Sequence, residues 1–301
     1  MNALKAADSH CHVHEALLPP TAGDDATDTA EHGTEEDRGD GWEQASVPAA
    51  VDACLDGVEL AVTMGTRPLD WAAVAALASC RAATVWPAFG VHPWHAFRVA
   101  PPRADSTAAQ PAWCTQLRRR LEAHPRAVVG EIGLDKVAKV PGTGAVDFAQ
   151  QTAVFAWQLA LAAELARPVS VHCVRAFGPL VAALQDAARA GRAPPAVAMH
   201  SYTGSADTVK QLLRLPPNTP VYFGFSACIC LRSPDKAAAA IAAVPDDRLL
   251  LESDHADPLH VVDDLRTIAE TVARVKGWAL DATVARTTAN ALRWVTASPG
   301  G

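Results

Sequence analysis

The chain has 301 residues, half of them apolar, and a formal net charge of −7 at pH 7. This length suffices for one α/β barrel domain of about 250 residues or for two smaller domains. The acidic balance argues against a general nucleic-acid coat protein, which would be basic overall, but it is compatible with an enzyme that has a locally basic cleft.

Short apolar runs typical of buried strands alternate with helical patterns along the chain. Strands are expected at residues 6–12, 58–64, 84–92, 127–134, 168–174, 196–202, 221–226 and 248–254. Helices are expected at residues 69–81, 113–123, 148–166, 180–190, 207–213, 234–243, 259–275 and 281–295. The pair Cys228 and Cys230 lies in an apolar run and is expected to pack as part of a strand.

Strands that alternate with helices predict a parallel sheet, and eight of them favour a closed (β/α)₈ TIM barrel. The competing fold is an open, doubly wound sheet, which would need a glycine-rich phosphate loop after the first strand. The chain has His-Cys-His-Val-His at that position. The sequence therefore predicts one α/β barrel domain over residues 1–301.

Two segments interrupt this pattern. Residues 21–46 are acidic and contain too few apolar side chains to order themselves, so they are expected to form a disordered insert. Such an insert could also contact a protein partner. Residues 99–111 are expected to form a second long loop.

Cysteine usage and hydropathy indicate where the protein works. The seven cysteines are scattered and odd in number, which favours a reducing, intracellular setting. The first residues lack the apolar stretch of a signal peptide, and no run of about 18 apolar residues could span a membrane. We therefore expect a cytoplasmic protein without a membrane segment, or a nuclear one if the source is eukaryotic.

Side chains suited to binding metal ions end five of the predicted strands. In a TIM barrel these strand ends meet at one mouth. His10 and His12 end the first strand, and their i, i+2 spacing directs both rings to one face. Four imidazoles and two carboxylates could hold two divalent ions if Glu131 bridges them, and Zn²⁺, Mn²⁺ and Mg²⁺ all remain candidates. The other strand-end residues are Glu131, His172, His200 and Asp254.

The motifs around these residues are similar to those of the TatD family of metal-dependent deoxyribonucleases. They are DSHCH, GVHPW, VGEIGLD, VSVHC, MHSYTGS, LLLESD and TTANAL, and they extend from Asp8 to Leu292. The resemblance implies an amidohydrolase-type TIM barrel that hydrolyses phosphodiester bonds, with DNA as substrate. It also implies one ion on His10, His12, Glu131 and Asp254, and a second on Glu131, His172 and His200. The catalytic residues would be Glu131 and Asp254, with Asp254 accepting the proton of the attacking water.

The chain departs from the common family pattern around the mouth. Lys136 replaces the usual aromatic residue after GEIGLD, and His255-Ala256-Asp257 replaces the usual Ala-Pro-aromatic stretch. The usual HCFSG reads HSYTG from His200. In these respects the chain resembles a fungal TatD-like subgroup. The changes leave the candidate ligands intact and concern the substrate more than the reaction type.

Three residues are candidates for substrate binding. His92 ends the third strand and resembles a family residue near the scissile group, although it could instead hold the loop before Pro93. Arg175, three residues after His172, could contact a phosphate. Tyr202 lies in the changed motif after the sixth strand. The eight tryptophans have no spacing typical of a stacking platform, so most are expected in the core.

Two other functions remain open from the sequence. The same fold and metals could hydrolyse an amide, a lactone or another small cyclic compound, as an amidohydrolase does. Relatives of that kind bridge their metals with a modified lysine on the fourth strand, where this chain has Glu131. The chain could also be a catalytically silent interaction protein, which the intact ligand set argues against.

Overall fold

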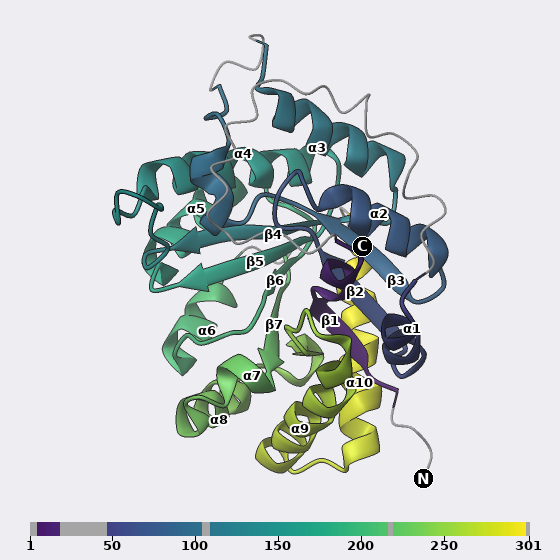
Figure 1. Cartoon of the computed structure of the whole chain (residues 1–301). Helices are drawn as coiled ribbons and strands as arrows, with labels where there is room; N and C mark the ends of the chain where they lie inside the picture. The colour runs from purple at the N-terminus through teal and green to yellow at the C-terminus, as the bar shows by residue number, and fades with distance from the viewer. Residues whose placement is uncertain (1–4, 19–46, 104–108, 216–218, 299–301) are drawn as a thin grey trace.

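Eight parallel strands form one sheet in the order β1 to β8, and the helices lie around its outside (Figure 1). The computed structural model describes residues 5–18, 47–103, 109–215 and 219–298. The predicted insert at residues 21–46 lies outside these described residues. The strands are β1 Ala7–Cys11, β2 Leu60–Met64, β3 Val85–Phe89, β4 Val128–Asp135, β5 Val169–Val174, β6 Val197–Met199, β7 Val221–Ser226 and β8 Leu249–Glu252.

The last strand returns to the first, which completes the barrel. Just beyond β8, the Asp254 N–H donates to the His10 carbonyl at 2.9 Å. Ser253 Oγ donates to Asp8 Oδ2 at 2.6 Å, and the Ser253 N–H donates to Asp8 Oδ1 at 3.0 Å. These contacts connect the first and the last strand of the sheet and confirm the predicted (β/α)₈ TIM barrel.

The helices agree with the predicted pattern at most positions, and two differ from it. Helix α1, before β2, was not among the expected helices. Cys228 and Cys230 lie in the short helix α7 directly after β7, so the expectation that they pack as strand residues was wrong. Their run is apolar throughout, and hydrophobicity alone does not separate a buried strand from a buried helical turn. The α-helices are α1 Ala49–Asp56, α2 Trp71–Cys80, α3 Ala112–Ala123, α4 Phe148–Glu164, α5 Phe177–Arg189, α6 Ala206–Leu212, α7 Ala227–Cys230, α8 Pro234–Ala243, α9 Pro258–Lys276 and α10 Leu280–Val295.

Alternation along the strands separates two hydrophobic layers. One set of side chains fills the barrel interior, and Leu60, Val62 and Met64 of β2 belong to it. The opposite set packs against the surrounding helices. No helix within the described ranges is both long and apolar enough to cross a bilayer.

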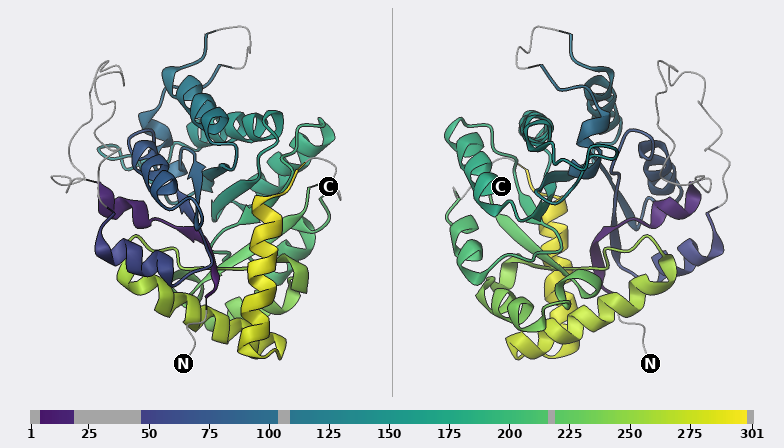
Figure 2. Two further views of the ribbon diagram at one scale, coloured as in Figure 1. Left: turned by 90° about the vertical axis from the view of Figure 1, so that its right-hand side faces the viewer. Right: turned by 60° about the vertical axis from the view of Figure 1, so that its left-hand side comes forward.

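Helix α10 covers the end of the barrel where the strands begin (Figure 2). Trp294 of α10 is fully buried against the interior layer. Asn290 Nδ2 donates to the carbonyl of Leu249 at 2.8 Å, and the Ala7 N–H donates to Thr288 Oγ1 at 3.1 Å. Because α10 occupies the strand starts, the candidate site lies at the opposite end, among the strand ends.

Candidate metal centre

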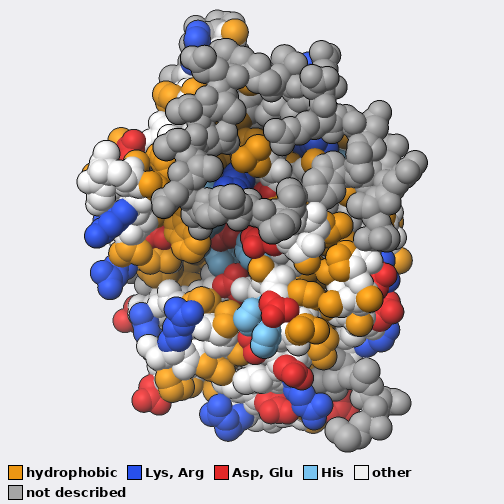
Figure 3. All heavy atoms as spheres, in the orientation of Figure 1, with side chains coloured by type: hydrophobic (Ala, Val, Ile, Leu, Met, Phe, Trp, Pro, Cys, Tyr) orange, Lys and Arg blue, Asp and Glu red, His pale blue; other side chains and the backbone are white. Residues whose placement is uncertain are grey.

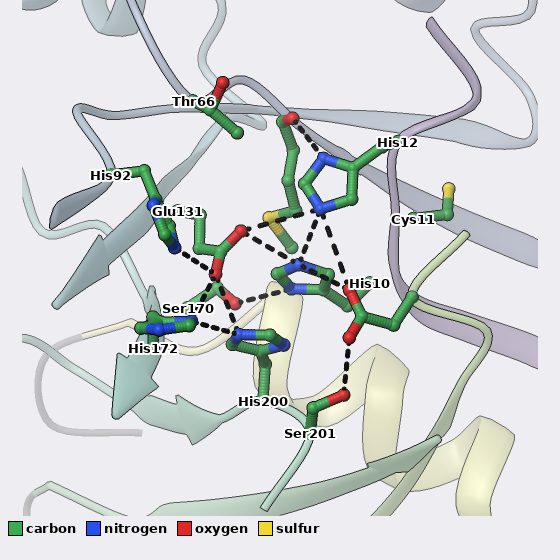
Figure 4. A network of polar contacts seen from close by, with 12 residues as sticks. His10, Cys11, His12, Thr66, His92, Glu131, Ser170, His172, His200 and Ser201 are labelled. Atoms are coloured by element: carbon green, nitrogen blue, oxygen red, sulfur yellow. Dashed lines mark hydrogen bonds and ion pairs between the residues drawn. The ribbon is translucent and has the colours of Figure 1, made fainter. Parts of the chain in front are cut away.

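Glu131 of β4 lies at the centre of the mouth, with its carboxylate among histidine rings (Figure 4). Its Oε2 lies 3.2 Å from His10 Nε2 and 3.5 Å from His12 Nε2. Its Oε1 lies 3.1 Å from His172 Nδ1 and 2.7 Å from His200 Nε2. Each oxygen therefore faces a separate pair of the histidines predicted as ligands, which suits a carboxylate that bridges two ions.

His10 and His12 present neighbouring nitrogens to this centre. Their Nε2 atoms lie 3.2 Å apart, close to the ~3.4 Å between two ligands of a tetrahedral ion with bonds of 2.0–2.1 Å. His12 Nδ1 lies 3.1 Å from the Met64 carbonyl oxygen and must donate to it, which leaves a lone pair on Nε2 of the neutral ring. His10 Nδ1 is held by Ser170 Oγ at 3.2 Å.

His172 and His200, at the ends of β5 and β6, form the second pair. His172 Nδ1 lies 3.1 Å from His200 Nε2. Behind them, Asp135 Oδ2 lies 3.4 Å from His172 Nε2, and Glu252 Oε1 lies 3.7 Å from His200 Nδ1. Metal-binding histidines commonly have such carboxylates on their outer nitrogen, because the carboxylate orients the ring and makes its other nitrogen a better ligand.

Asp254 faces the first pair from the opposite side. Its Oδ1 lies 3.8 Å from both His10 Nε2 and His12 Nε2, and its Oδ2 accepts a hydrogen bond from Ser201 Oγ at 2.8 Å. Asp254, Ser201 and Arg175 have positive φ angles of 58°, 36° and 53°. They follow β8, β6 and β5, and residues in this uncommon conformation concentrate at functional sites.

His92 reaches the centre from the loop after β3, but with a different chemical role. Its Nε2 lies 3.2 Å from Glu131 Oε1, while its Nδ1 accepts from the Trp94 N–H at 3.1 Å. Burial lowers the pKa of His92 to about 4, so the ring is neutral at pH 7. Because Nδ1 is the acceptor, Nε2 carries the proton. His92 therefore presents a hydrogen-bond donor to the centre and not a lone pair.

The charges at the mouth favour a cation. Burial alone would raise the pKa of Glu131, but the imidazoles, His200 foremost, hold it well below its usual range. Burial likewise opposes ionisation of Asp254, yet His200 and His10 lower its pKa. Both carboxylates are therefore ionised at pH 7. Burial would lower the pKa of His200, but Glu131 raises it well above its usual value, so a proton on His200 supplies positive charge between the carboxylates, and a bound divalent ion would take the place of that proton.

Figure 3 shows histidine and acidic side chains gathered on the face seen in Figure 1. The structure thus brings together all six residues predicted as metal ligands. Among the described residues, ligand atoms at the mouth group within 4.8 Å as His10–His12–Glu131, as His10–His200–Asp254 and as His92–Glu131–His172. The third group includes His92, whose Nε2 carries a proton, so proximity alone does not make it a ligand.

Two buried glutamines of α4 support this arrangement and were not predicted. Gln158 Oε1 accepts from the Val91 N–H at 2.7 Å, and its Nε2 donates to the Val91 carbonyl at 3.1 Å. Gln151 makes the same pair of contacts with the backbone of Asp135, at 2.8 and 2.9 Å. They fix the backbone at Asp135 and beside His92. Their spacing of seven on one helix face was an available signal, because polar side chains on a buried face need partners.

One predicted substrate residue is corrected by the structure. Tyr202 is buried, with its hydroxyl donating to the Ser205 carbonyl at 2.9 Å and its ring packed against Phe177 and Phe223. It belongs to the layer between strands and helices and not to the mouth, so it cannot contact a substrate there. Arg175 is exposed directly after β5, and its contact with phosphate stays a prediction.

Comparison with known proteins now identifies the family. The family model described as "TatD related DNase" matches residues 7–296. The chain belongs to the TatD-related DNase family. This confirms the resemblance of its motifs and the prediction of a metal-dependent hydrolase.

Individual TatD relatives cover most of the chain. Cut9-interacting protein scn1 of Schizosaccharomyces pombe is 27% identical in an alignment that covers 76% of this chain and 89% of that protein. The 3'-5' ssDNA/RNA exonuclease TatD of Edwardsiella piscicida is 32% identical over 209 residues, which cover 69% and 71%. The crystal structure of a TatD family hydrolase from Entamoeba histolytica has a TM-score of 0.70 at 14% identity, and it covers 97% of this chain and 98% of that one. The last likeness supports the fold alone.

Proposed function

We propose that this TatD protein is a nuclease that hydrolyses phosphodiester bonds with the help of two divalent ions. The observation that carries this proposal is the division of the Glu131 carboxylate between two histidine pairs. Oε2 would hold the first ion together with His10, His12 and Asp254. Oε1 would hold the second ion together with His172 and His200.

When bound, such ions polarise a phosphoryl oxygen and lower the pKa of a coordinated water. The chain's own groups then have distinct tasks. Asp254 is ionised and can accept the water's proton, while Ser201 holds one of its oxygens in place. His92 can donate a hydrogen bond from its Nε2–H group to a negatively charged oxygen of the substrate.

An exposed tryptophan beside the centre supports a substrate with nucleobases. Trp94 is 58% exposed, although most tryptophans were expected in the core. Its Nε1 donates to Asp135 Oδ2 at 2.7 Å, and its ring lies 4.9 Å from that of His92 and 6.2 Å from that of His172. A flat aromatic surface in a fixed position suits stacking of an unpaired base. We therefore propose single-stranded DNA or RNA as the substrate, with Arg175 contacting its phosphates.

The proposal also names the candidate ions, the cellular location and a possible protein partner. Nitrogen and carboxylate ligands are compatible with Zn²⁺, Mn²⁺ or Mg²⁺. The scattered cysteines favour action in the cytoplasm or nucleus. The acidic segment 21–46 could contact a protein partner, and the name of the S. pombe relative indicates that scn1 interacts with a protein.

The decisive test is metal add-back. The purified protein is stripped with a chelator, then assayed with each ion on end-labelled single-stranded DNA, RNA and a panel of small esters and lactones. We expect hydrolysis of the nucleic acid only after an ion is restored. Glu131→Gln, which cannot supply two negatively charged oxygens, should lose both activity and part of its bound metal. Full activity after stripping, or turnover of only the small substrates, would overturn the proposal.

A further inference from the structure

A second cluster of ligand-type side chains lies beside the mouth and shares none of the six residues described above. Cys228 belongs to α7, His255 follows β8, and Asp264 belongs to α9. One ligand atom from each lies within 4.8 Å of the other two. All three residues are half-buried, and the side chains of His255 and Asp264 are 27% and 25% exposed, so the cluster is partly enclosed and partly open to solvent. Three separate elements therefore converge on one small volume.

Existing contacts hold the three side chains in place. His255 Nε2 lies 2.7 Å from Asp264 Oδ2. Cys228 Sγ donates to the Ser253 carbonyl at 3.3 Å, which keeps the sulfur against the loop that contains His255. The His255 carbonyl accepts from the His12 N–H at 2.8 Å. The same loop thus connects this cluster with the mouth.

We propose that Cys228, His255 and Asp264 form a separate binding site for a thiophilic divalent ion of the Zn²⁺ class. Sulfur, imidazole nitrogen and a carboxylate oxygen are the three ligand types that Zn²⁺ takes in proteins. Ligand atoms around a tetrahedral Zn²⁺ are ~3.3–3.6 Å apart, so a separation below 4.8 Å needs only small side-chain rotations. Three protein ligands leave the fourth position for water or another small ligand.

The ligand chemistry distinguishes this site from the main centre. Mg²⁺ and Ca²⁺ prefer oxygen ligands, so a site with a sulfur should discriminate against both. The six candidate ligands of the main centre include no sulfur. Cys11 lies next to His10 and His12 in the chain, but its side chain points away from the Glu131 carboxylate (Figure 4). Its Sγ contacts the carbonyl of Val62 and Oγ1 of Thr63. Detection of a bond between an ion and sulfur would therefore identify binding at the second site and not at the main centre.

Binding at this site must remove a proton from the thiol. Burial raises the pKa of Cys228 to about 11, so without an ion the sulfur is protonated at pH 7. The ion takes the place of that proton, and one proton is released to solvent for each ion bound through the sulfur.

The test is titration of the full-length protein with Co²⁺, a spectroscopic substitute for Zn²⁺. Thiolate bound to Co²⁺ gives a charge-transfer band in the near ultraviolet, which imidazole and carboxylate ligands do not give. We expect this band to saturate at the intensity of one thiolate-bound Co²⁺ per chain, whatever the main centre binds, and to be lost on addition of Zn²⁺. Cys228→Ser should abolish it, and Asp264→Asn should weaken Co²⁺ binding by at least ~10-fold.

Matched variants make each outcome informative. Cys80→Ser removes an exposed cysteine at the end of α2 and should leave the band unchanged. Glu131→Gln, which impairs the main centre, should also leave it unchanged, so failure of the proposed nuclease mechanism would not affect this result. Circular dichroism verifies that each variant is folded. A wild-type protein without the band, a band that survives Cys228→Ser, or one lost in Cys80→Ser would overturn the proposal.

Discussion

Asp135 Oδ2 lies 3.4 Å from His172 Nε2, and this contact determines which ring nitrogen of His172 faces the mouth. The same oxygen accepts from Trp94 Nε1 at 2.7 Å. Burial would raise the pKa of Asp135, but the hydrogen bonds from His172 and Trp94 lower it to about 2. One ionised carboxylate therefore orients both a candidate metal ligand and the exposed indole beside it.

Asp135→Asn should weaken metal binding without unfolding the protein. The amide keeps an oxygen for one donor but removes the negative charge behind His172, and loss of such outer partners typically reduces metal affinity by ~10- to 100-fold. Calorimetric titration with Zn²⁺ or Mn²⁺ measures the change. Asp186→Asn is the control, because Asp186 is exposed on α5 and forms an ion pair with nearby Arg189 on the same helix. Equal affinities in the two variants would contradict the role given to Asp135.

Trp94→Ala should raise KM for single-stranded substrates and leave kcat nearly unchanged. Stacking contributes ~1–3 kcal/mol per base, equivalent to a ~5- to 150-fold rise in KM. Trp94→Phe keeps a flat ring and should recover part of the loss. An oligonucleotide without bases at its terminal positions provides the control, since the wild type and Trp94→Ala should bind it equally. An equal penalty on both oligonucleotides would indicate that Trp94 acts through structure and not through stacking.

The side chains that meet at the strand ends could be predicted from the sequence because two regular properties determine where they lie. Parallel strands in a barrel all end at one mouth, and alternate residues on a strand face the same way. From these properties alone, His10, His12 and Glu131 could be placed together. The structure agrees at these positions, with contacts of 3.2–3.5 Å between Glu131 Oε2 and the two rings.

Residues beyond the strand ends were less predictable, because loops have no comparable periodicity. After β6 the chain turns through Ser201, whose φ is positive, and this turn directs Ser201 to Asp254 and Tyr202 into the core. The exposure of Trp94 depends on a distant partner, Asp135, that is 41 residues away in the chain. Similarly, the cluster at Cys228 joins three elements that no sequence spacing connects.

Deletion of residues 24–41 should leave the barrel as stable as before. The segment is acidic and poor in apolar residues, so we expect it to contribute little buried surface to the core. We expect the melting temperature to stay within a few degrees of the wild-type value in differential scanning calorimetry. Replacement of the segment by a Gly-Ser linker of equal length controls for the change in loop length. A large drop in both variants would show that the segment packs against the barrel.

The substitution Asp254→Asn separates the two roles given to Asp254, ion binding and proton acceptance. Asn is nearly isosteric and tolerates the positive φ of 58° at this position, so the backbone should not change. It keeps one oxygen for an ion or for Ser201, but an amide cannot take up a proton at neutral pH.

General-base assistance typically contributes ~10²- to 10⁴-fold, so kcat of Asp254→Asn should fall by at least ~10²-fold. Bound metal, measured by mass spectrometry, and the Kd for a single-stranded oligonucleotide should change much less. Asp186→Asn, the same exchange at an exposed position, should match the wild type in all three measurements. Equal losses of metal, substrate affinity and turnover would make Asp254 chiefly a ligand. Near-normal turnover would show that another group accepts the proton of the attacking water. His92 is a poor candidate for that role because its Nε2 already carries a proton.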